Sequence, residues 1–407
     1  MKKAILLLAS MLFLNLSAFP GVFRGSQDSI RTTLPRFLSA KTSHGMVLPT
    51  NDFVSGDLFI PYYNSISLKY GIAARGDYWQ EYAFGMPYMG VGISRTNYFR
   101  KDDLGQPLTV FLFQGGHLTD FTKKVTLNYE WNAGAAFNWK PYDPFDNPNN
   151  VAIGSPVNIY AGVNIFLKWK LDKKIDLNVG AEFEHFSNGA FKYPNAGINQ
   201  TSVFVELAYY INRNRAIYTP AEYQYPAFTK KKEHDIMFLI SSHHARLDTL
   251  GTGLADKYAQ RNFVVLGTSY AYMFNNHYRY RWGPSVEFTY DESAGVQSWR
   301  EYNPLDGRIY DRVKLGEFGK RFSLGVSMKG EVKMPLYSAF LNIGYDILHA
   351  DVNASRLYQI FGIKAPLKEN FFGVFGIRAT NFGKSQYMFL NFGYTIKREE
   401  RKKEVIL

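Results

Sequence analysis

Apolar and polar side chains alternate over long stretches of this chain. From residue 157 to 171 every second side chain is apolar, while those between are mostly polar or small; the apolar set is Val157, Ile159, Ala161, Val163, Ile165, Leu167, Trp169 and Leu171. The same period of two runs through 175–187 and 203–212. Because successive side chains of a β-strand point to opposite faces, the pattern predicts strands with one apolar face. The first two exceed the roughly 9 to 11 residues that a tilted strand needs to cross a bilayer.

Further segments with this pattern are spread over the whole chain. They lie at 63–74, 88–98, 108–118, 125–141, 235–246, 260–273, 278–290, 320–333, 337–348, 357–364, 371–380 and 386–397, with a weak one at 44–50. We therefore expect an all-β fold, an antiparallel transmembrane β-barrel of about 14–16 strands. The alternative arrangement is two barrel-like halves of about eight strands each. A soluble β-sandwich would also alternate, but its strands are rarely this long.

The order of segments suggests two halves behind an export signal. Residues 1–18 carry two lysines, a short apolar run and small residues in turn, which is typical of a secretory signal peptide. Residues 19–213 would form the first half of the barrel and 235–397 the second. Between them, 214–234 contains two prolines and a basic cluster, as expected of a linker or a long turn. Residues 398–407 form a charged tail.

The two halves also share a short segment. LNVGAEFEH at 177–185 resembles LNIGYDILH at 341–349, which aligns His185 with His349 and Ser187 with Asp351. A repeated half that lacks the serine would produce this match, and so would chance similarity between two barrel strands.

Composition narrows the functional classes. Of 407 residues 46% are hydrophobic, but after the N-terminus no uncharged apolar run reaches the roughly 18 residues of a transmembrane helix. There is no cysteine, hence no disulfide, no thiolate chemistry and no lipoprotein anchor. The net charge of +12 is scattered along the chain, which fits a polyanionic membrane surface better than nucleic acid. We find no zinc spacing, phosphate-binding loop or dinucleotide motif, so neither a metal nor a cofactor is predicted.

The stretch HFSNGAFKYPNAGIN, residues 185–199, carries the candidate chemistry. His185 and Ser187 are two apart in a strand, so they share the face of Phe183 and Val179, the face expected to meet lipid. Polar side chains facing hydrocarbon are costly and mark functional sites. A histidine beside a serine can act as base and nucleophile on an ester. The alternative is that both residues sit in the headgroup region, wetted and without a catalytic role.

Connection lengths orient this pair. Only three residues, 172–174, separate two of the strands, whereas 142–154 and 188–200 are long and rich in Asn, Pro and Gly. Outer-membrane barrels have short periplasmic turns and long external loops. We therefore expect His185 and Ser187 to lie near the outer leaflet.

The same stretch resembles the signature of the PagL-type lipid A 3-O-deacylases, outer-membrane esterases with His and Ser on the barrel exterior. KPYDPFDNPNNVAIGSPVN at 140–158 and NFGKSQYMFLNFGY at 381–394 are similar to segments of longer, Bacteroidetes-like members known as acyloxyacyl hydrolases. The resemblance covers most of the chain beyond the signal peptide. It implies that Ser187 is the nucleophile, His185 the general base, and that Asn188 holds the oxyanion with the backbone N–H of Gly189.

The third position of the family's triad departs from the pattern. The family has a glutamate twelve residues after the serine, where this chain has Asn199. An asparagine can orient an imidazole through its carbonyl oxygen but cannot stabilise the imidazolium with a full charge. No nearby acid replaces it, because the candidates fall on the inward face; they are Glu182, Glu184 and Glu206.

The resemblance implies a serine esterase of the outer membrane that hydrolyses an ester-linked acyl chain of lipid A. Lipid A or lipopolysaccharide in the outer leaflet is the expected partner, and Lys192 and Lys140 could bind its phosphates as point charges. Two alternatives stay open. One is a noncatalytic pore or scaffold; the other is a phospholipase or acyltransferase that uses the same Ser-His pair.

Overall fold

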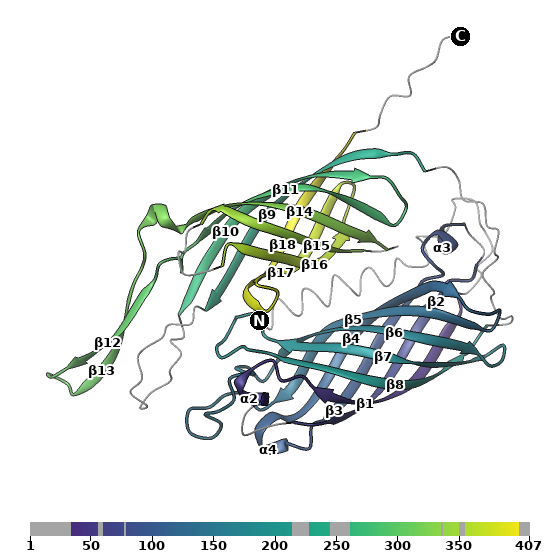
Figure 1. Cartoon of the computed structure of the whole chain (residues 1–407), viewed down its shortest axis with the longest axis horizontal. Helices are drawn as coiled ribbons and strands as arrows, with labels where there is room; N and C mark the ends of the chain where they lie inside the picture. Colours follow the sequence, from purple (N-terminus) through teal and green to yellow (C-terminus); the bar gives the residue numbers. More distant parts are fainter. Residues whose placement is uncertain are drawn as a thin grey trace, which may run out of the picture. The chain divides into compact units, whose positions relative to one another are not determined.

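The computed structural model describes residues 34–55, 60–76, 79–213, 228–244, 261–334, 337–349 and 355–398. The chain divides into two compact units, Met1–Asn188 with Pro194–Tyr225, and Gly189–Tyr193 with Pro226–Leu407. Each unit contains one closed eight-stranded barrel of antiparallel strands (Figure 1). The predicted signal peptide, most of the predicted linker and nearly all of the C-terminal tail lie outside the described residues.

The first barrel is formed by consecutive strands that each pair with the next. They are β1 (Arg36–Val47), β2 (Tyr63–Ala73), β3 (Tyr88–Asn97), β4 (Gly105–Asp120), β5 (Val125–Trp139), β6 (Asn158–Lys170), β7 (Ile175–Ser187) and β8 (Ile198–Tyr210). Pairing of β1 with β8, for example Ala40 opposite Leu207, closes the ring. Along these strands the burial alternates, and outward residues such as Val163 and Phe183 are exposed. Alternation with apolar side chains outward is the pattern of a barrel in lipid.

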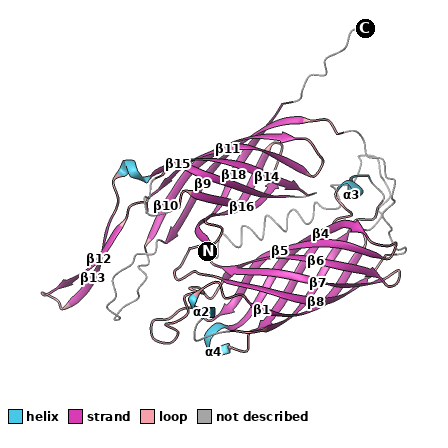
Figure 2. Cartoon of the chain, in the orientation of Figure 1, coloured by secondary structure: helices cyan, strands magenta, loops and turns pink. Residues whose placement is uncertain are grey.

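The two ends of the first barrel differ in their connections. At the end where β7 finishes, the links are long, and two of them carry the short helices α2 (Asp52–Ser55) and α4 (Lys101–Leu104). At the other end the links after β4 and β6 are short turns, while the link after β2 carries α3 (Trp79–Ala83). Figure 2 shows these helices as small additions at the barrel ends. Among the described residues, no helix is long and apolar enough to cross a membrane.

The second barrel has the same closed form. Its strands are β9 (Lys231–His244), β10 (Asn262–Asn275), β11 (Tyr280–Asp291), β14 (Phe322–Lys333), β15 (Ser338–Leu348), β16 (Leu357–Pro366), β17 (Phe371–Thr380) and β18 (Lys384–Arg398). It closes where β18 pairs with β9. Between β11 and β14 the chain forms a separate hairpin of β12 (Gln297–Asn303) and β13 (Arg308–Lys314), followed by the 3₁₀ turn η1 (Phe318–Arg321). The hairpin extends beyond the barrel strands in Figure 1.

The interior of the first barrel is filled by paired charges and aromatic rings. Lys69 lies 2.8 Å from Glu130 and 2.9 Å from Glu206, and Lys41 pairs with Glu182. Rings from several strands belong to the buried cluster of the same barrel: Phe37, Tyr63, Tyr98, Phe111, Phe113, Trp139, Tyr160, Phe166, Phe186 and Phe204. An eight-stranded barrel is just wide enough for side chains to fill it. The charges of Lys41, Lys69 and their glutamates are paired, as burial requires.

The second barrel is filled in a related way. Arg281 contacts Glu233 at 2.9 Å, Asp235 at 2.7 Å and Glu331 at 2.5 Å. Lys364 adds an ion pair with Asp235 at 2.8 Å. Both described barrel interiors are therefore occupied by side chains.

The all-β, antiparallel barrel fold predicted from the alternation is confirmed. Of the two predicted arrangements, the strands form the pair of eight-stranded barrels; a single barrel of 14–16 strands was wrong. The weak strand predicted at 44–50 begins earlier, at Arg36. The prediction missed its first part because inward positions there carry small or charged residues, such as Lys41, which pairs with Glu182 in the interior. The second half begins at Lys231, inside the segment predicted as a linker. The β12–β13 hairpin was missed because its two short strands are largely polar.

The apparent repeat between the halves has no structural counterpart. LNVGAEFEH lies on β7, the seventh strand of its barrel, whereas LNIGYDILH lies mainly on β15, the fifth strand of the other. The topological equivalent of β7 is β17, which ends in Arg378, Ala379 and Thr380. The match is therefore a similarity between barrel strands that occupy different positions.

Candidate active site

The imidazole of His185 lies between a hydroxyl and an amide. Its Nε2 is 2.9 Å from Ser187 Oγ, and its Nδ1 is 2.7 Å from Asn199 Oδ1. An amide oxygen can only accept, so Nδ1 carries the proton and Nε2 keeps a lone pair for the Ser187 hydroxyl. This is the tautomer that a general base requires.

Strand pairing explains why these three residues meet. His185 and Ser187 are alternate residues at the end of β7, so their side chains leave the sheet on the same side. Asn199, at the start of β8, is the Cα partner of His185 in the antiparallel ladder. Directly opposed residues have neighbouring side chains, which places the amide beside the ring. A spacing of twelve residues between Ser187 and the third position is thus the span of the hairpin connection.

The three side chains belong to the outward face of the barrel. On β7 the inward positions are the buried acids and Phe186, and the outward ones include the exposed Val179 and Phe183. Ser187 itself is only 4% exposed, while His185 and Asn199 are half-buried. Ser187 therefore lies on the outward side of the barrel, at the end of a strand, and not in the barrel interior.

The connection between β1 and β2 braces the site. Asn199 Nδ2 donates to Thr50 Oγ1 at 2.9 Å, and the Leu48 N–H donates to the Asn199 carbonyl at 2.8 Å. Asn51 Nδ2 donates to the Gly197 carbonyl at 2.7 Å. These contacts join segments 146 and 149 residues apart, so no local pattern in the sequence indicates them.

Gly197 passes close to the His185 ring. Its φ of 76° lies in the left-handed region, and a Cβ built there would be 3.0 Å from His185 Cε1. A glycine is required for both reasons, since other residues are strained at this φ and the ring leaves little space. The predicted site did not include Gly197, although a glycine inside a motif loop is a usable signal.

Asn188 and Gly189 are the residues predicted to bind the oxyanion. The Asn188 backbone N–H donates to Asn195 Oδ1 at 2.7 Å, so it is already engaged. The Asn188 side chain is buried. Gly189 has a φ of 64°. Gly189 and Lys192 belong to the segment grouped with the second unit, and their roles at the site stay predictions.

Lys140 lies in the long connection between β5 and β6, at the same end of the barrel as Ser187. Its backbone N–H donates to the Leu104 carbonyl at 3.0 Å, which ties this connection to α4. The side chain is half-buried. Its role as a phosphate ligand stays a prediction.

The three acids considered as substitutes for Asn199 lie on the inward face, as the period of two predicts. Glu182, Glu184 and Glu206 point inward and are buried. Glu184 accepts from Tyr160 at 2.7 Å and from Gln200 at 2.5 Å, on the opposite side of the strand from His185. Of these residues and Asn199, it is Asn199 that contacts the His185 ring.

The second barrel contains a cluster of serine, histidine and aspartate, but its geometry differs from that of Ser187, His185 and Asn199. His243 Nε2 is 3.2 Å from Asp291 Oδ1 and 3.3 Å from Ser293 Oγ. Ser293 donates its hydroxyl proton to Asp291 at 2.7 Å. Since the carboxylate and the hydroxyl meet the same ring nitrogen, the cluster does not form a base and nucleophile pair. Among the residues that the structure describes, no group of His, Cys, Asp and Glu is arranged to hold a metal ion.

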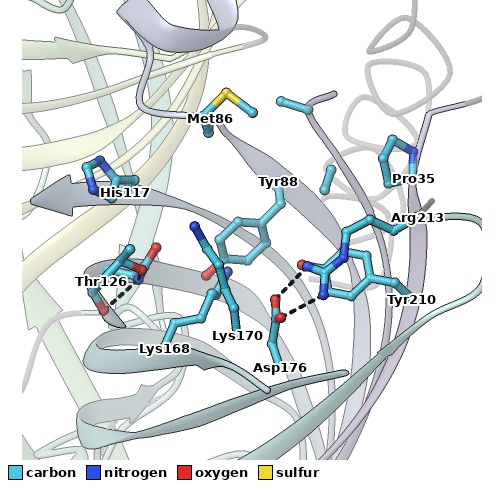
Figure 3. A pocket seen from close by; sticks show the side chains of 13 residues that line it. Pro35, Met86, Tyr88, His117, Thr126, Lys168, Lys170, Asp176, Tyr210 and Arg213 are labelled. Atoms are coloured by element: carbon cyan, nitrogen blue, oxygen red, sulfur yellow. Dashed lines mark hydrogen bonds and ion pairs between the residues drawn. The ribbon is translucent and has the colours of Figure 1, made fainter. Parts of the chain in front are cut away.

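A cavity of about 70 Å³ lies at the opposite end of the first barrel from Ser187 (Figure 3). Arg213 closes one side, with a two-pronged contact to Asp176 at 2.7 and 2.9 Å. Burial lowers the pKa of Arg213, but the hydrogen bond to Asp176 and the nearby acidic groups together raise this pKa above its ordinary value. Lys168 lies 4.7 Å from the centre of the Tyr88 ring. This cavity lies at the mouth of the barrel, and neither His185 nor Ser187 lines it.

Comparison with protein families extends over both barrels. The family described as lipid A 3-O-deacylase (PagL) matches residues 65–208, and the acyloxyacyl hydrolase, C-terminal domain, matches residues 232–398. The two matches together span more than half of the chain. The chain belongs to the family of PagL-type deacylases and acyloxyacyl hydrolases. The PagL match contains β7 and β8, and therefore His185, Ser187 and Asn199.

Membership of the PagL family and the barrel fold place the protein in the outer membrane, in a family of hydrolases. Similar solved structures include the outer membrane enzyme PagL, at 16% identity over 41% of this chain and 97% of that chain, with a TM-score of 0.26. The siderophore receptor PirA from Acinetobacter baumannii matches at 9% identity, over 90% of this chain and 62% of that one, with a TM-score of 0.23. The translocator domain of the autotransporter NalP from Neisseria meningitidis matches at 8% identity, over 96% of this chain and 97% of that one, with a TM-score of 0.18. No curated protein sequence matches the chain.

Proposed function

We propose that this protein is a serine esterase that hydrolyses an ester-linked acyl chain of lipid A. The observation that carries the proposal is the chain of contacts from Ser187 through His185 to Asn199 on the outward face of the first barrel. Hydroxyl, imidazole and an orienting acceptor in this order are the parts of a serine hydrolase triad. The substrate class follows from the family, which is described as lipid A 3-O-deacylase.

The first half of the reaction forms an acyl-enzyme. Ser187 Oγ attacks the ester carbonyl carbon while its proton passes to His185 Nε2, 2.9 Å away. The tetrahedral intermediate collapses when the bond to the leaving sugar oxygen breaks, and that oxygen takes the proton from Nε2. The acyl chain is then bound to Ser187, and the sugar hydroxyl is free.

The second half restores the enzyme. A water molecule gives a proton to His185 Nε2 as its oxygen attacks the acyl carbonyl, and Ser187 leaves with the proton from the same nitrogen. The products are a fatty acid and a lipid A with one acyl chain fewer. Throughout, Asn199 Oδ1 keeps the proton on Nδ1, as the 2.7 Å contact supports. Because the amide is neutral, the imidazolium gains a hydrogen bond but no opposite charge.

The outward face explains how such a substrate would arrive. An acyl chain in the outer leaflet can reach Ser187 sideways through the membrane, without entering the filled interior of the barrel. The proposed orientation puts the long connections outside the cell, following the usual arrangement of outer-membrane barrels. In this orientation Lys140 and Lys192 would meet the phosphates of lipid A, and the Asn188 side chain with the Gly189 N–H would bind the oxyanion.

The filled interiors argue against a pore as the main function. Ion pairs and rings occupy the described part of both barrel interiors. A phospholipase or an acyltransferase would use the same Ser187 and His185. Only the products separate these activities: a fatty acid from phospholipid, or an acyl chain moved to a second lipid.

Mass spectrometry of lipid A after incubation with the purified protein in detergent tests the proposal. Wild type should remove one acyl mass, and Ser187→Ala and His185→Ala should each lower the rate by at least about 10³-fold, as loss of a triad member does. Phospholipid is supplied in a parallel reaction. Unchanged lipid A with wild type, or equal activity of the Ser187→Ala variant, would refute the esterase mechanism.

A further inference from the structure

We infer that Thr50 is a positioning residue of this site, which holds the Asn199 amide in the plane that His185 needs. The inference rests on the proposed esterase function. The observation behind it is a hydrogen bond of 2.9 Å, which Asn199 Nδ2 donates to Thr50 Oγ1. This nitrogen is the end of the amide that does not contact the imidazole. Each end of the Asn199 side chain thus has one partner.

An asparagine needs such a support more than an acid does. Either oxygen of a carboxylate can accept the Nδ1 proton, whereas only one end of an amide can. Rotation about the last side-chain bond of asparagine is only broadly restrained. Without a partner for Nδ2, rotation takes Oδ1 out of line with Nδ1, and a half turn presents an N–H to the ring. The Nδ1 proton then has no acceptor, and Nε2 is no longer kept free for Ser187.

The backbone around Thr50 makes it suitable for this task. The Thr50 N–H donates to the Leu48 carbonyl at 2.8 Å, and the Leu48 N–H donates to the Asn199 carbonyl at 2.8 Å. The neighbouring Asn51 binds the Gly197 carbonyl at 2.7 Å. Thr50 is therefore fixed to the backbone of the residue whose side chain it supports. The β1–β2 connection thus supports a triad whose three members come from β7 and β8.

The substitution Thr50→Val removes the hydroxyl and keeps the shape. One lost hydrogen bond of about 1 kcal/mol corresponds to roughly a fivefold decrease of kcat, with KM nearly unchanged. Thr50→Ser keeps an oxygen and should stay within about twofold of wild type. Thr42→Val is the matched control, since Thr42 is an exposed, outward residue of β1. In an Asn199→Asp background, Thr50→Val should cost less than about threefold, because the aspartate bond to the imidazole is charged.

A second readout does not depend on turnover. The Nδ1 proton of His185, identified by its absence in His185→Ala, can be followed by ¹⁵N NMR in the full-length protein in detergent. Exchange of this proton with water should be faster in Thr50→Val than in wild type or Thr50→Ser. Unchanged proton exchange in Thr50→Val would overturn the inference, and so would an equal loss of kcat in the wild-type and Asn199→Asp backgrounds. A wild type that releases no acyl chain while its Nδ1 proton still depends on Thr50 would instead refute the esterase proposal alone.

Discussion

The substitution Asn199→Asp tests the weakest member of the proposed triad with the smallest possible change. It replaces an amide nitrogen by oxygen and brings a negative charge to within about 2.7 Å of His185 Nδ1. In the proposed mechanism His185 becomes a cation when it accepts the Ser187 proton. The amide stabilises that cation only through a dipole, whereas the carboxylate does so through a charge. We therefore expect Asn199→Asp to be the faster enzyme.

The size of the gain follows from the contact that is already present. A neutral hydrogen bond contributes about 1 kcal/mol net, and one to a charged group about 1.5–3 kcal/mol. The difference of about 1–2 kcal/mol in the transition state corresponds to roughly a 5- to 30-fold increase in kcat. Thr50 can remain a partner in the variant, because its hydroxyl can donate to the carboxylate instead of accepting from the amide.

The assay is the initial rate of fatty acid release from lipid A, followed by mass spectrometry across a range of pH. Asn199→Leu, which keeps the size but lacks the acceptor, should be slower than wild type by about tenfold. In Asn199→Asp the acidic limb of the rate profile should move to higher pH, because the carboxylate favours the protonated imidazole. The thermal unfolding temperature of each variant shows whether a change in rate comes from loss of the folded barrel.

One result would refute this reasoning. If Asn199→Asp is folded but no faster than wild type, while Ser187→Ala is inactive, then Asn199 does not stabilise a cation on His185. The base would then have to be oriented by another group.

Three further outcomes follow from the structure. Gly197→Ala should lower kcat with little change in unfolding temperature, because its Cβ would be 3.0 Å from His185 Cε1 at a φ of 76°; wild-type rates would contradict the close approach. Lys69→Met should destabilise the first barrel by about 3–5 kcal/mol, since it leaves Glu130 and Glu206 buried without their cation; an unchanged denaturant midpoint would argue against that ion pair. In planar bilayers the wild-type protein should conduct no steady current, and stable channels would revive the pore alternative.

Much of the site is predictable from the sequence because its chemistry is local. His185 and Ser187 are two residues apart, and the period of two along their strand assigns both to the outward face. The inward direction of Glu182 and Glu184 follows from the same parity. Asn199 was found through the family's spacing, and the structure gives the physical reason, since it faces His185 across the β7–β8 hairpin. The roles of these residues in catalysis remain our proposal.

The positions of the strands and the direction of their side chains are readable from the amino-acid sequence, because both depend on neighbouring residues and on the geometry of an extended chain. That the strands close twice, through the pairs β1–β8 and β9–β18, is visible only in three dimensions. Closure is a pairing between residues far apart in the chain, and alternation looks the same whichever partner a strand has. The contact of Thr50 with Asn199, 149 residues apart, is likewise visible only in three dimensions. It depends on the closed ring that brings β1 beside β8.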